Sequence, residues 1–245
     1  MMYSLSLVML FLLSPAPQDN ADLPAEESCK KGDKGACINY LKSIYKMGNL
    51  DTSLKKAMEY CSDKMQDVCL LGATIASYSS RYDTCVSLLE KRCSAKSPAI
   101  CAVLSDCLFE LNKVEESLGP AKIACENGAF DACSTVSAYF LTREQRGEAL
   151  VWARRGCEKG SAMSCGAASA IYVSDGDFKE ALEYGKRGCE LSDRNACKAA
   201  AVSCERLKFG CELEYYERCC KLRDKDCCQV LNKRNKLDKN EKGNR

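Results

Sequence analysis

Apolar and small residues recur along the chain in two helical stripes, and both stripes repeat every 32 residues. In the first stripe they lie three and seven positions after a cysteine, a spacing that places them on one face of an α-helix. In the second stripe they lie seven and four positions before the next cysteine, again on one helical face. Turn sequences such as 47–51 and 174–177, which contain Gly and Asp, separate the two stripes. The pattern predicts a helix A, a short turn and a helix B in every repeat.

The two stripes can be read as columns of equivalent positions. The first holds Tyr40, Gly72, Leu104, Val136, Ala168 and Ala200, together with Ile44, Ala76, Leu108, Phe140, Tyr172 and Cys204. The second holds Leu54, Val86, Leu118, Leu150 and Leu182, together with Ala57, Leu89, Ala121, Ala153 and Gly185. We expect these columns to form the core, with small residues where neighbouring backbones approach closely.

Six cysteine pairs, each with seven residues between the partners, set the frame of the repeat: Cys29/Cys37, Cys61/Cys69, Cys93/Cys101, Cys125/Cys133, Cys157/Cys165 and Cys189/Cys197. Helix-turn-helix repeats of about this length stack into solenoids, because a single repeat cannot bury its own apolar face. The cysteines fall where helix B of one repeat gives way to helix A of the next, so we expect a disulfide across each connection. Each bond closes a nine-residue loop, worth about 2.6 kcal/mol in the chain-entropy model.

The other eight cysteines fit the same helical geometry. Cys85 and Cys107 come level across one helix pair, and Cys204 and Cys211 flank the turn of the last repeat. Cys219 and Cys220 face Cys227 and Cys228, and spacing allows either parallel or crossed pairing there. All twenty cysteines can therefore be paired, and we predict an all-α, TPR-like solenoid of about six repeats with a disulfide per repeat.

The cysteine content also indicates the compartment. Twenty cysteines in 245 residues are tolerable only where disulfides form and persist, outside the cytosol. The apolar run Leu5–Leu13 is too short for a membrane helix and is followed by small residues, as in a signal peptide. We expect a signal peptide over 1–21, cleaved after Ala16 or Ala21, a repeat solenoid over 22–231 and a charged, disordered tail over 232–245. The mature protein would be secreted or periplasmic, with no membrane span.

Charge points to no polyanionic partner. The formal net charge is +2, and the segment 232–245 alone contributes about +4, because it holds six basic and two acidic residues. The rest of the chain is near neutral and lacks the broad basic surface that nucleic-acid binding requires. We expect a monomer that binds no nucleic acid and needs no cofactor.

The helix pairs joined by C-x7-C, with phrases such as the one from Ala181 to Leu191, resemble the Sel1-like repeats of the Helicobacter cysteine-rich proteins over about Ala25 to Val230. The resemblance implies a right-handed α/α superhelix, one disulfide per repeat and an exported protein. Members of that family are commonly labelled penicillin-binding proteins or β-lactamases and are discussed as host-interacting factors. This chain departs from them in its shorter repeat, in the absence of a G-x-G turn and in its additional cysteines. A mitochondrial assembly factor for cytochrome c oxidase is similar in repeat and cysteine usage, but the apparent signal segment argues against that location.

Catalytic chemistry finds little support in the residues. The chain has no histidine, which excludes Ser-His-Asp and Cys-His arrangements and zinc sites with His ligands. Matches to S-x-x-K begin at Ser28 and at Ser53, but the S-D-N and K-T-G elements of a serine β-lactamase are absent. The C-x7-C pairs do not have the spacing of zinc ligands, so no metal site is expected. A thiol oxidoreductase would need a C-x-x-C motif, and the adjacent cysteines near residue 220 only approach it.

Two functional hypotheses remain. In the first, the protein is a scaffold that binds a protein or peptide partner, from a host or the cell envelope, through the concave helix-A surface. In the second, which follows from the family label, it binds or weakly hydrolyses β-lactams or peptidoglycan. The absent catalytic elements favour the first hypothesis.

In a right-handed α/α superhelix the A helices line the concave side, so positions two, five and nine after the cysteine would face the partner. These positions are Asn39, Lys42, Lys46; Leu71, Thr74, Tyr78; Val103, Asp106, Glu110; Thr135, Ala138, Thr142; Ala167, Ala170, Ser174; and Ala199, Val202, Arg206. We select Lys42, Tyr78, Asp106, Glu110 and Arg206 as the binding residues. They could equally be solvated only, and outer helix-B positions such as Lys55, Glu90 and Lys179 should tolerate change.

The cysteine ladder predicts that the exported protein contains no free thiol and that its helical signal is lost at a far lower temperature after reduction. Alkylation under non-reducing conditions followed by mass spectrometry, with circular dichroism melts of both forms, measures this. Several alkylated cysteines among the six C-x7-C pairs would contradict the architecture, whereas alkylation at Cys220 or Cys228 alone would revise only the last connection.

Overall fold

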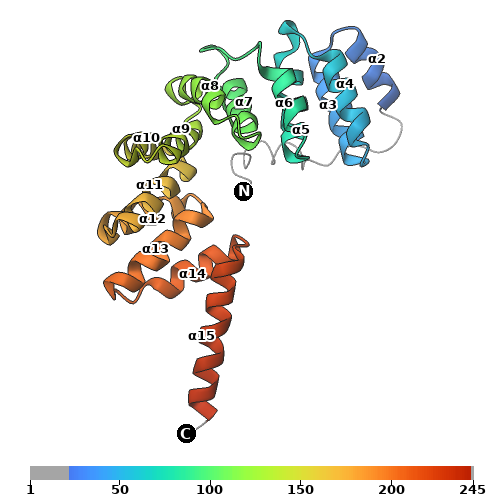
Figure 1. Ribbon diagram of the computed structural model, residues 1–245. Helices are drawn as coiled ribbons and strands as arrows, with labels where there is room; N and C mark the ends of the chain where they lie inside the picture. The colour runs from blue at the N-terminus through green and yellow to red at the C-terminus, as the bar shows by residue number, and fades with distance from the viewer. Residues whose placement is uncertain (1–21, 244–245) are drawn as a thin grey trace. The chain divides into compact units, whose positions relative to one another are not determined.

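A computed structural model describes residues 22–243 of the chain, with side chains over 24–234, and every regular element in that range is helical. Helices that contain the second cysteine of a pair correspond to helix A: α3 (Lys34–Lys46), α5 (Gln66–Tyr78), α7 (Pro98–Glu110), α9 (Ala132–Thr142), α11 (Ala162–Asp175), α13 (Arg194–Leu207) and α15 (Lys225–Gly243). Those that end at or shortly before or after the first cysteine correspond to helix B: α2 (Asp22–Lys30), α4 (Leu50–Tyr60), α6 (Tyr82–Leu89), α8 (Val114–Glu126), α10 (Arg146–Glu158), α12 (Phe178–Glu190) and α14 (Glu212–Lys221). A short 3-10 turn, η1 (Asp63–Met65), precedes α5. The predicted alternation of A and B helices is confirmed (Figure 1).

The chain divides into two compact units between Ala129 and Phe130. The first contains α2 to α8 and the second α9 to α15. Within each unit, consecutive helices pack against one another, and successive A helices also touch: α3 with α5, α5 with α7, α9 with α11, and α11 with α13. Each unit is therefore a stack of helix pairs, as expected for a solenoid. In the described part of the chain, no helix is long and apolar enough to cross a membrane.

Disulfides hold the connections from helix B to helix A. The pairs Cys29–Cys37, Cys61–Cys69, Cys93–Cys101, Cys157–Cys165 and Cys189–Cys197 have Cα atoms 4.5 to 4.7 Å apart. Cys125 and Cys133 are also disulfide-bonded. The additional bonds are Cys85–Cys107, Cys204–Cys211, Cys219–Cys227 and Cys220–Cys228, so the last connection is paired in parallel. All twenty cysteines lie in the described range, and none is free.

A left-handed residue stands at the same register in every turn from helix A to helix B. Eleven positions after the second cysteine, φ is positive at Gly48, Ser80, Asn112, Glu144, Gly176 and Lys208. A left-handed residue just past the last helical turn satisfies carbonyls that have no partner inside the helix. Only Gly48 and Gly176 adopt this conformation without steric cost. At the other four positions a side chain disfavours the positive φ, and the repeat has the same backbone geometry there despite that cost.

The two units have differently built cores. In the first, large aliphatic residues are fully buried, among them Leu41, Val68, Ile75 and Leu89. In the second, the core is largely made of alanine and half-cystine, with Val136, Ile171 and two tyrosines of α14 as the larger members. The predicted core column Tyr40, Gly72, Leu104, Val136, Ala168 and Ala200 is buried throughout.

Small residues in the second unit permit close contact between helices. A Cβ placed on Gly188 of α12 would lie 2.5 Å from the Cβ of Ala196 and 3.1 Å from the carbonyl oxygen of Ala162. A Cβ on Gly156 of α10 would lie 2.2 Å from the Oγ of Ser164. At such distances neither glycine can be replaced without a shift of its neighbours, so the thin core still requires close complementarity.

The last helix reaches into the segment 232–245 that was expected to be a disordered tail. Helix α15 continues from Lys225 to Gly243, so the backbone of 232–243 is helical. This segment contains four lysines, which have high intrinsic helix propensity, and three asparagines, which do not. The expected signal peptide, residues 1–21, lies outside the described residues.

Replacement of Gly188 by alanine should destabilise the protein by about 1–3 kcal/mol, because the added methyl group overpacks the contact between α12 and α13. The matched change Gly147→Ala in α10, where a Cβ would meet nothing within 4 Å, should stabilise it by about 0.5–1 kcal/mol. Chemical denaturation of the disulfide-intact proteins measures both effects. A neutral Gly188 variant would contradict the close packing of these helices.

Candidate functional site

Four of the selected binding residues lie on consecutive A helices of the first unit. Lys42 is half-buried on α3, Tyr78 is half-buried at the end of α5, and on α7 Asp106 is half-buried and Glu110 exposed. We call Lys42, Tyr78, Asp106 and Glu110, together with the exposed Asn39 of α3, the A-helix face. Because α3 touches α5 and α5 touches α7, these residues belong to adjacent packed helices.

The charges on this face are segregated. Lys42 and Lys46 belong to α3, whereas Asp106 and Glu110 belong to α7, with Tyr78 of α5 between the two helices. Burial raises the pKa of Tyr78 to about 12, so its phenol is neutral at physiological pH and can offer a hydroxyl and an apolar ring. The A-helix face thus combines a basic side, an aromatic centre and an acidic side.

Part of the predicted helix-A surface is not accessible. Leu71 and Ala199 are only 7% and 8% exposed, and Thr74 is fully buried, where its hydroxyl donates to the carbonyl oxygen of Leu70 at 2.7 Å. For α5 the reason is that it packs against four helices, α3, α4, α6 and α7, which cover positions two and five after its cysteine. The prediction that these three residues lie on the surface is therefore wrong, because they are buried.

Arg206, the fifth selected residue, lies in the second unit. It is exposed on α13, and its Cζ atom lies 6.0 Å from the ring centroid of Phe178 on α12, at the limit for a cation–π contact. Arg206 is therefore not counted as part of the A-helix face, whose residues all lie in the first unit.

The S-x-x-K match at Ser53 does not form a β-lactamase nucleophile. The Ser53 side chain is fully buried between α3 and α4, and its hydroxyl donates to the carbonyl oxygen of Leu41 at 3.2 Å. The lysine of the same motif, Lys56, instead bonds the Glu26 carboxylate at 3.1 Å. Hydrogen bonds from Lys30 and then Lys56 lower the pKa of Glu26 to about 2. The motif is a structural feature of the first repeat, tying α2 to α4. Ser28, of the other match, is half-buried on α2.

One group of potential metal ligands occurs among the described residues: Cys219, Asp224 and Cys227. The two sulfurs are joined in a disulfide, whereas a cysteine binds a metal as a thiolate. The Asp224 carboxylate accepts a hydrogen bond from the backbone N–H of Cys227 at 3.0 Å, as an N-cap does. In the oxidised protein this group caps α15 and does not form a metal site.

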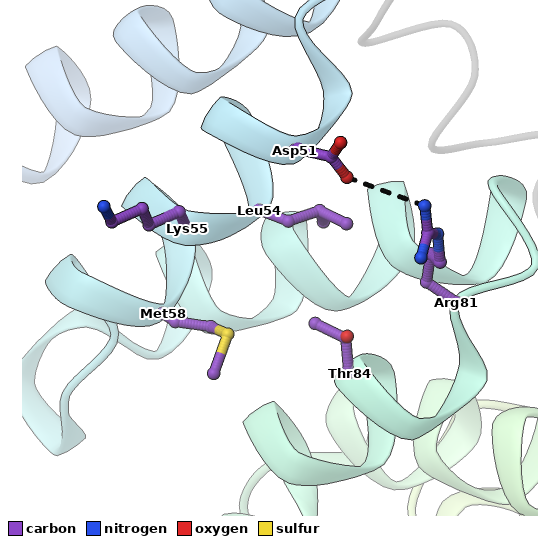
Figure 2. Close-up of a pocket in the computed structure, with 6 residues that line it drawn as sticks. All are labelled: Asp51, Leu54, Lys55, Met58, Arg81 and Thr84. Atoms are coloured by element: carbon purple, nitrogen blue, oxygen red, sulfur yellow. Dashed lines mark ion pairs between the residues drawn. The ribbon is translucent and has the colours of Figure 1, made fainter.

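A pocket of about 330 Å³ opens between two B helices of the first unit, where no binding site was predicted. Figure 2 shows its lining: Asp51, Leu54, Lys55 and Met58 from α4, with Arg81 and Thr84 from the start of α6. Leu54, Met58 and Thr84 form its apolar part, and the Met58 side chain is 54% exposed. Asp51 and Arg81 form an ion pair at one end, 3.6 Å between Oδ1 and Nη2.

The pocket could not be found from periodicity alone. Its lining comes from two helices one repeat apart, four residues of α4 and two from the start of α6. The one sequence signal is Met58, an apolar residue outside the predicted core columns. Lys55, expected at a plain solvent-facing position, instead lines this pocket.

Comparison with known proteins identifies the fold and no family. No family model matches the sequence, and a search of the curated proteins finds no match. Among solved structures, yeast Tom70 aligns with a TM-score of 0.60 and 12% identity over 81% of this chain and 46% of that one. A thermophilic TPR protein of Thermus thermophilus aligns with a TM-score of 0.53 and 13% identity, over 69% and 98% of the two chains. MamA aligns with a TM-score of 0.51 and 13% identity, over 61% and 92%.

The fold is that of a TPR-like helical-repeat solenoid. At these identities the likeness concerns the arrangement of helices alone.

Ser53→Ala should lower the free energy of unfolding by about 0.5–1.5 kcal/mol, because it removes a buried hydrogen bond to Leu41. It should leave any hydrolysis of a chromogenic cephalosporin unchanged. Ser28→Ala, which alters the other motif, is the matched control in the same denaturation and turnover assays. Loss of turnover in either variant, with the variant still folded at the assay temperature, would restore the enzymatic hypothesis.

Proposed function

We propose that this protein is an exported, disulfide-stabilised repeat scaffold that binds a protein or peptide partner through its A-helix face. The observation that carries the proposal is the placement of Lys42, Tyr78, Asp106 and Glu110 on three consecutive A helices that pack side by side. Repeat solenoids present such stacked helices as extended binding surfaces. The TPR-like fold supports this class of function by analogy only.

The segregation of charge suggests how a partner would lie. Neighbouring helices in a stack are about 8–10 Å apart, so α3 and α7 are separated by about 16–20 Å. An extended peptide advances about 3.3 Å per residue, so five or six residues would cross the face. Such a peptide would carry an acidic group toward Lys42 and a basic group toward Asp106 and Glu110, with Tyr78 against its middle.

The proposed compartment is secreted or periplasmic, because a chain with no free thiol requires oxidising surroundings. The apparent signal segment and the resemblance to the Helicobacter cysteine-rich proteins support the same assignment. On this proposal the solenoid begins near residue 22, works as a monomer and meets its partner at a host or cell-envelope surface. Arg206 would offer a separate contact on the second unit.

The enzymatic alternative has less support. It requires a lysine-activated serine, and in the Ser53 motif both side chains are engaged in structural contacts. Binding of peptidoglycan would remain compatible with the scaffold proposal, since peptidoglycan contains short peptides and no turnover is needed.

A photo-cross-linking residue at Asn39 or Glu110 should capture a partner from extracellular or cell-envelope fractions of the source organism. The same residue at Glu90, exposed at the end of α6, or at Lys179 on α12 should capture none. Once the partner is known, Tyr78→Ala and the charge reversal Glu110→Lys should each weaken binding about tenfold, and Glu90→Lys should have no effect. If all cross-links arose at Glu90 and Lys179, the proposal for the A-helix face would fail even though the fold is correct.

A further inference from the structure

The pocket between α4 and α6 has two chemically distinct parts. Leu54, Met58 and Thr84 supply the apolar part, and Met58 is a flexible thioether that adapts to the shape of what it contacts. The other end carries the guanidinium of Arg81, with Asp51 beside it, whereas the Lys55 side chain points away from Arg81 (Figure 2). A volume of about 330 Å³ is at the low end of the range for ligand sites and suits one side chain with the backbone next to it.

The Arg81–Asp51 pair is loosely held. Its N···O distance of 3.6 Å exceeds that of a hydrogen bond, and the two side chains are 57% and 89% exposed. Exposed pairs of this kind contribute little to stability, so another carboxylate could replace Asp51 at small cost. Arg81 presents a planar fork of donors that matches a carboxylate well. The lining contains two basic residues, Lys55 and Arg81, and one acidic residue, Asp51, so its formal net charge is +1.

We propose that this pocket is a second binding site, and that it takes an aliphatic side chain of a partner protein flanked in sequence by an acidic residue. The aliphatic group packs on Leu54, Met58 and Thr84, and the neighbouring carboxylate binds Arg81. The site lies on B helices and includes no residue of the A-helix face. A test of this proposal is therefore independent of a test of the function proposed above.

The test uses three peptides on the disulfide-intact chain labelled with methyl-13C methionine and 15N. The peptides are acetyl-Ala-Leu-Glu-Ala-amide, its Gln analogue, and acetyl-Ala-Ala-Glu-Ala-amide. The Leu-Glu peptide should shift the Met58 methyl and the Thr84 amide with a Kd in about the millimolar range, as expected for a ligand of this size. The Met47 methyl, on a residue of similar exposure (56%) outside the pocket, should not move. At low salt the Gln analogue should bind up to about fivefold more weakly, and the peptide without leucine should bind no more than marginally.

Matched variants separate the two parts of the pocket. Arg81→Gln should abolish the preference for Glu over Gln, whereas Lys91→Gln, an exposed change elsewhere in the unit, should retain it. Met58→Ala should weaken both leucine peptides when followed at the Thr84 amide, and Met47→Ala should not. Circular dichroism confirms that each variant folds.

Several results would overturn the proposal. They are the absence of any shift at Met58 and Thr84, equal affinity for the Glu and Gln peptides, or equal binding with and without leucine. A Met58 methyl that shifts with protein concentration alone would show that a second copy of the chain occupies the pocket instead. Shifts confined to Asn39 and Glu110 would assign the peptide to the A-helix face.

Discussion

The disulfide across each connection from helix B to helix A is the constraint on which the rest of this structure depends. It fixes the last turn of one helix against the first turn of the next, with Cα atoms 4.5 to 4.7 Å apart in the regular pairs. Because each bond removes conformational freedom from the unfolded chain, a repeat need not bury as much apolar surface to be stable. The second unit illustrates this relation, with a core made largely of alanine and half-cystine.

A core made of small residues requires close contact between the helices. Helices that meet through Gly156 and Gly188 leave no space for even a methyl group, so the second unit tolerates little change at its contacts. The first unit instead buries leucine, isoleucine and valine. Each unit also has an additional disulfide, Cys85–Cys107 between α6 and α7 in the first and Cys204–Cys211 between α13 and the start of α14 in the second. The pocket at Met58 lies between α4 and the start of α6 of the first unit.

The proposed functions follow from this division between a constrained backbone and variable side chains. The same helix pair recurs with its turn held in a left-handed conformation, even where Ser80, Asn112, Glu144 or Lys208 must adopt it. Because the backbone geometry repeats so strictly, equivalent side chains of neighbouring helices lie at regular intervals. The charged residues of the A-helix face and the residues that line the pocket between α4 and α6 both lie on such neighbouring helices.

The sequence by itself determined the helix pairs, their register, the C-x7-C connections and most core columns, because helical period and cysteine spacing are local properties of the chain. It left the pairing at Cys219, Cys220, Cys227 and Cys228 open, and only the tertiary structure joined them in parallel. Tertiary structure also decided that Leu71 and Thr74 are covered, since exposure depends on how many helices surround α5. It revealed the pocket as well, because its lining comes from two helices of different repeats, α4 and α6, and no single stripe of residues records their packing.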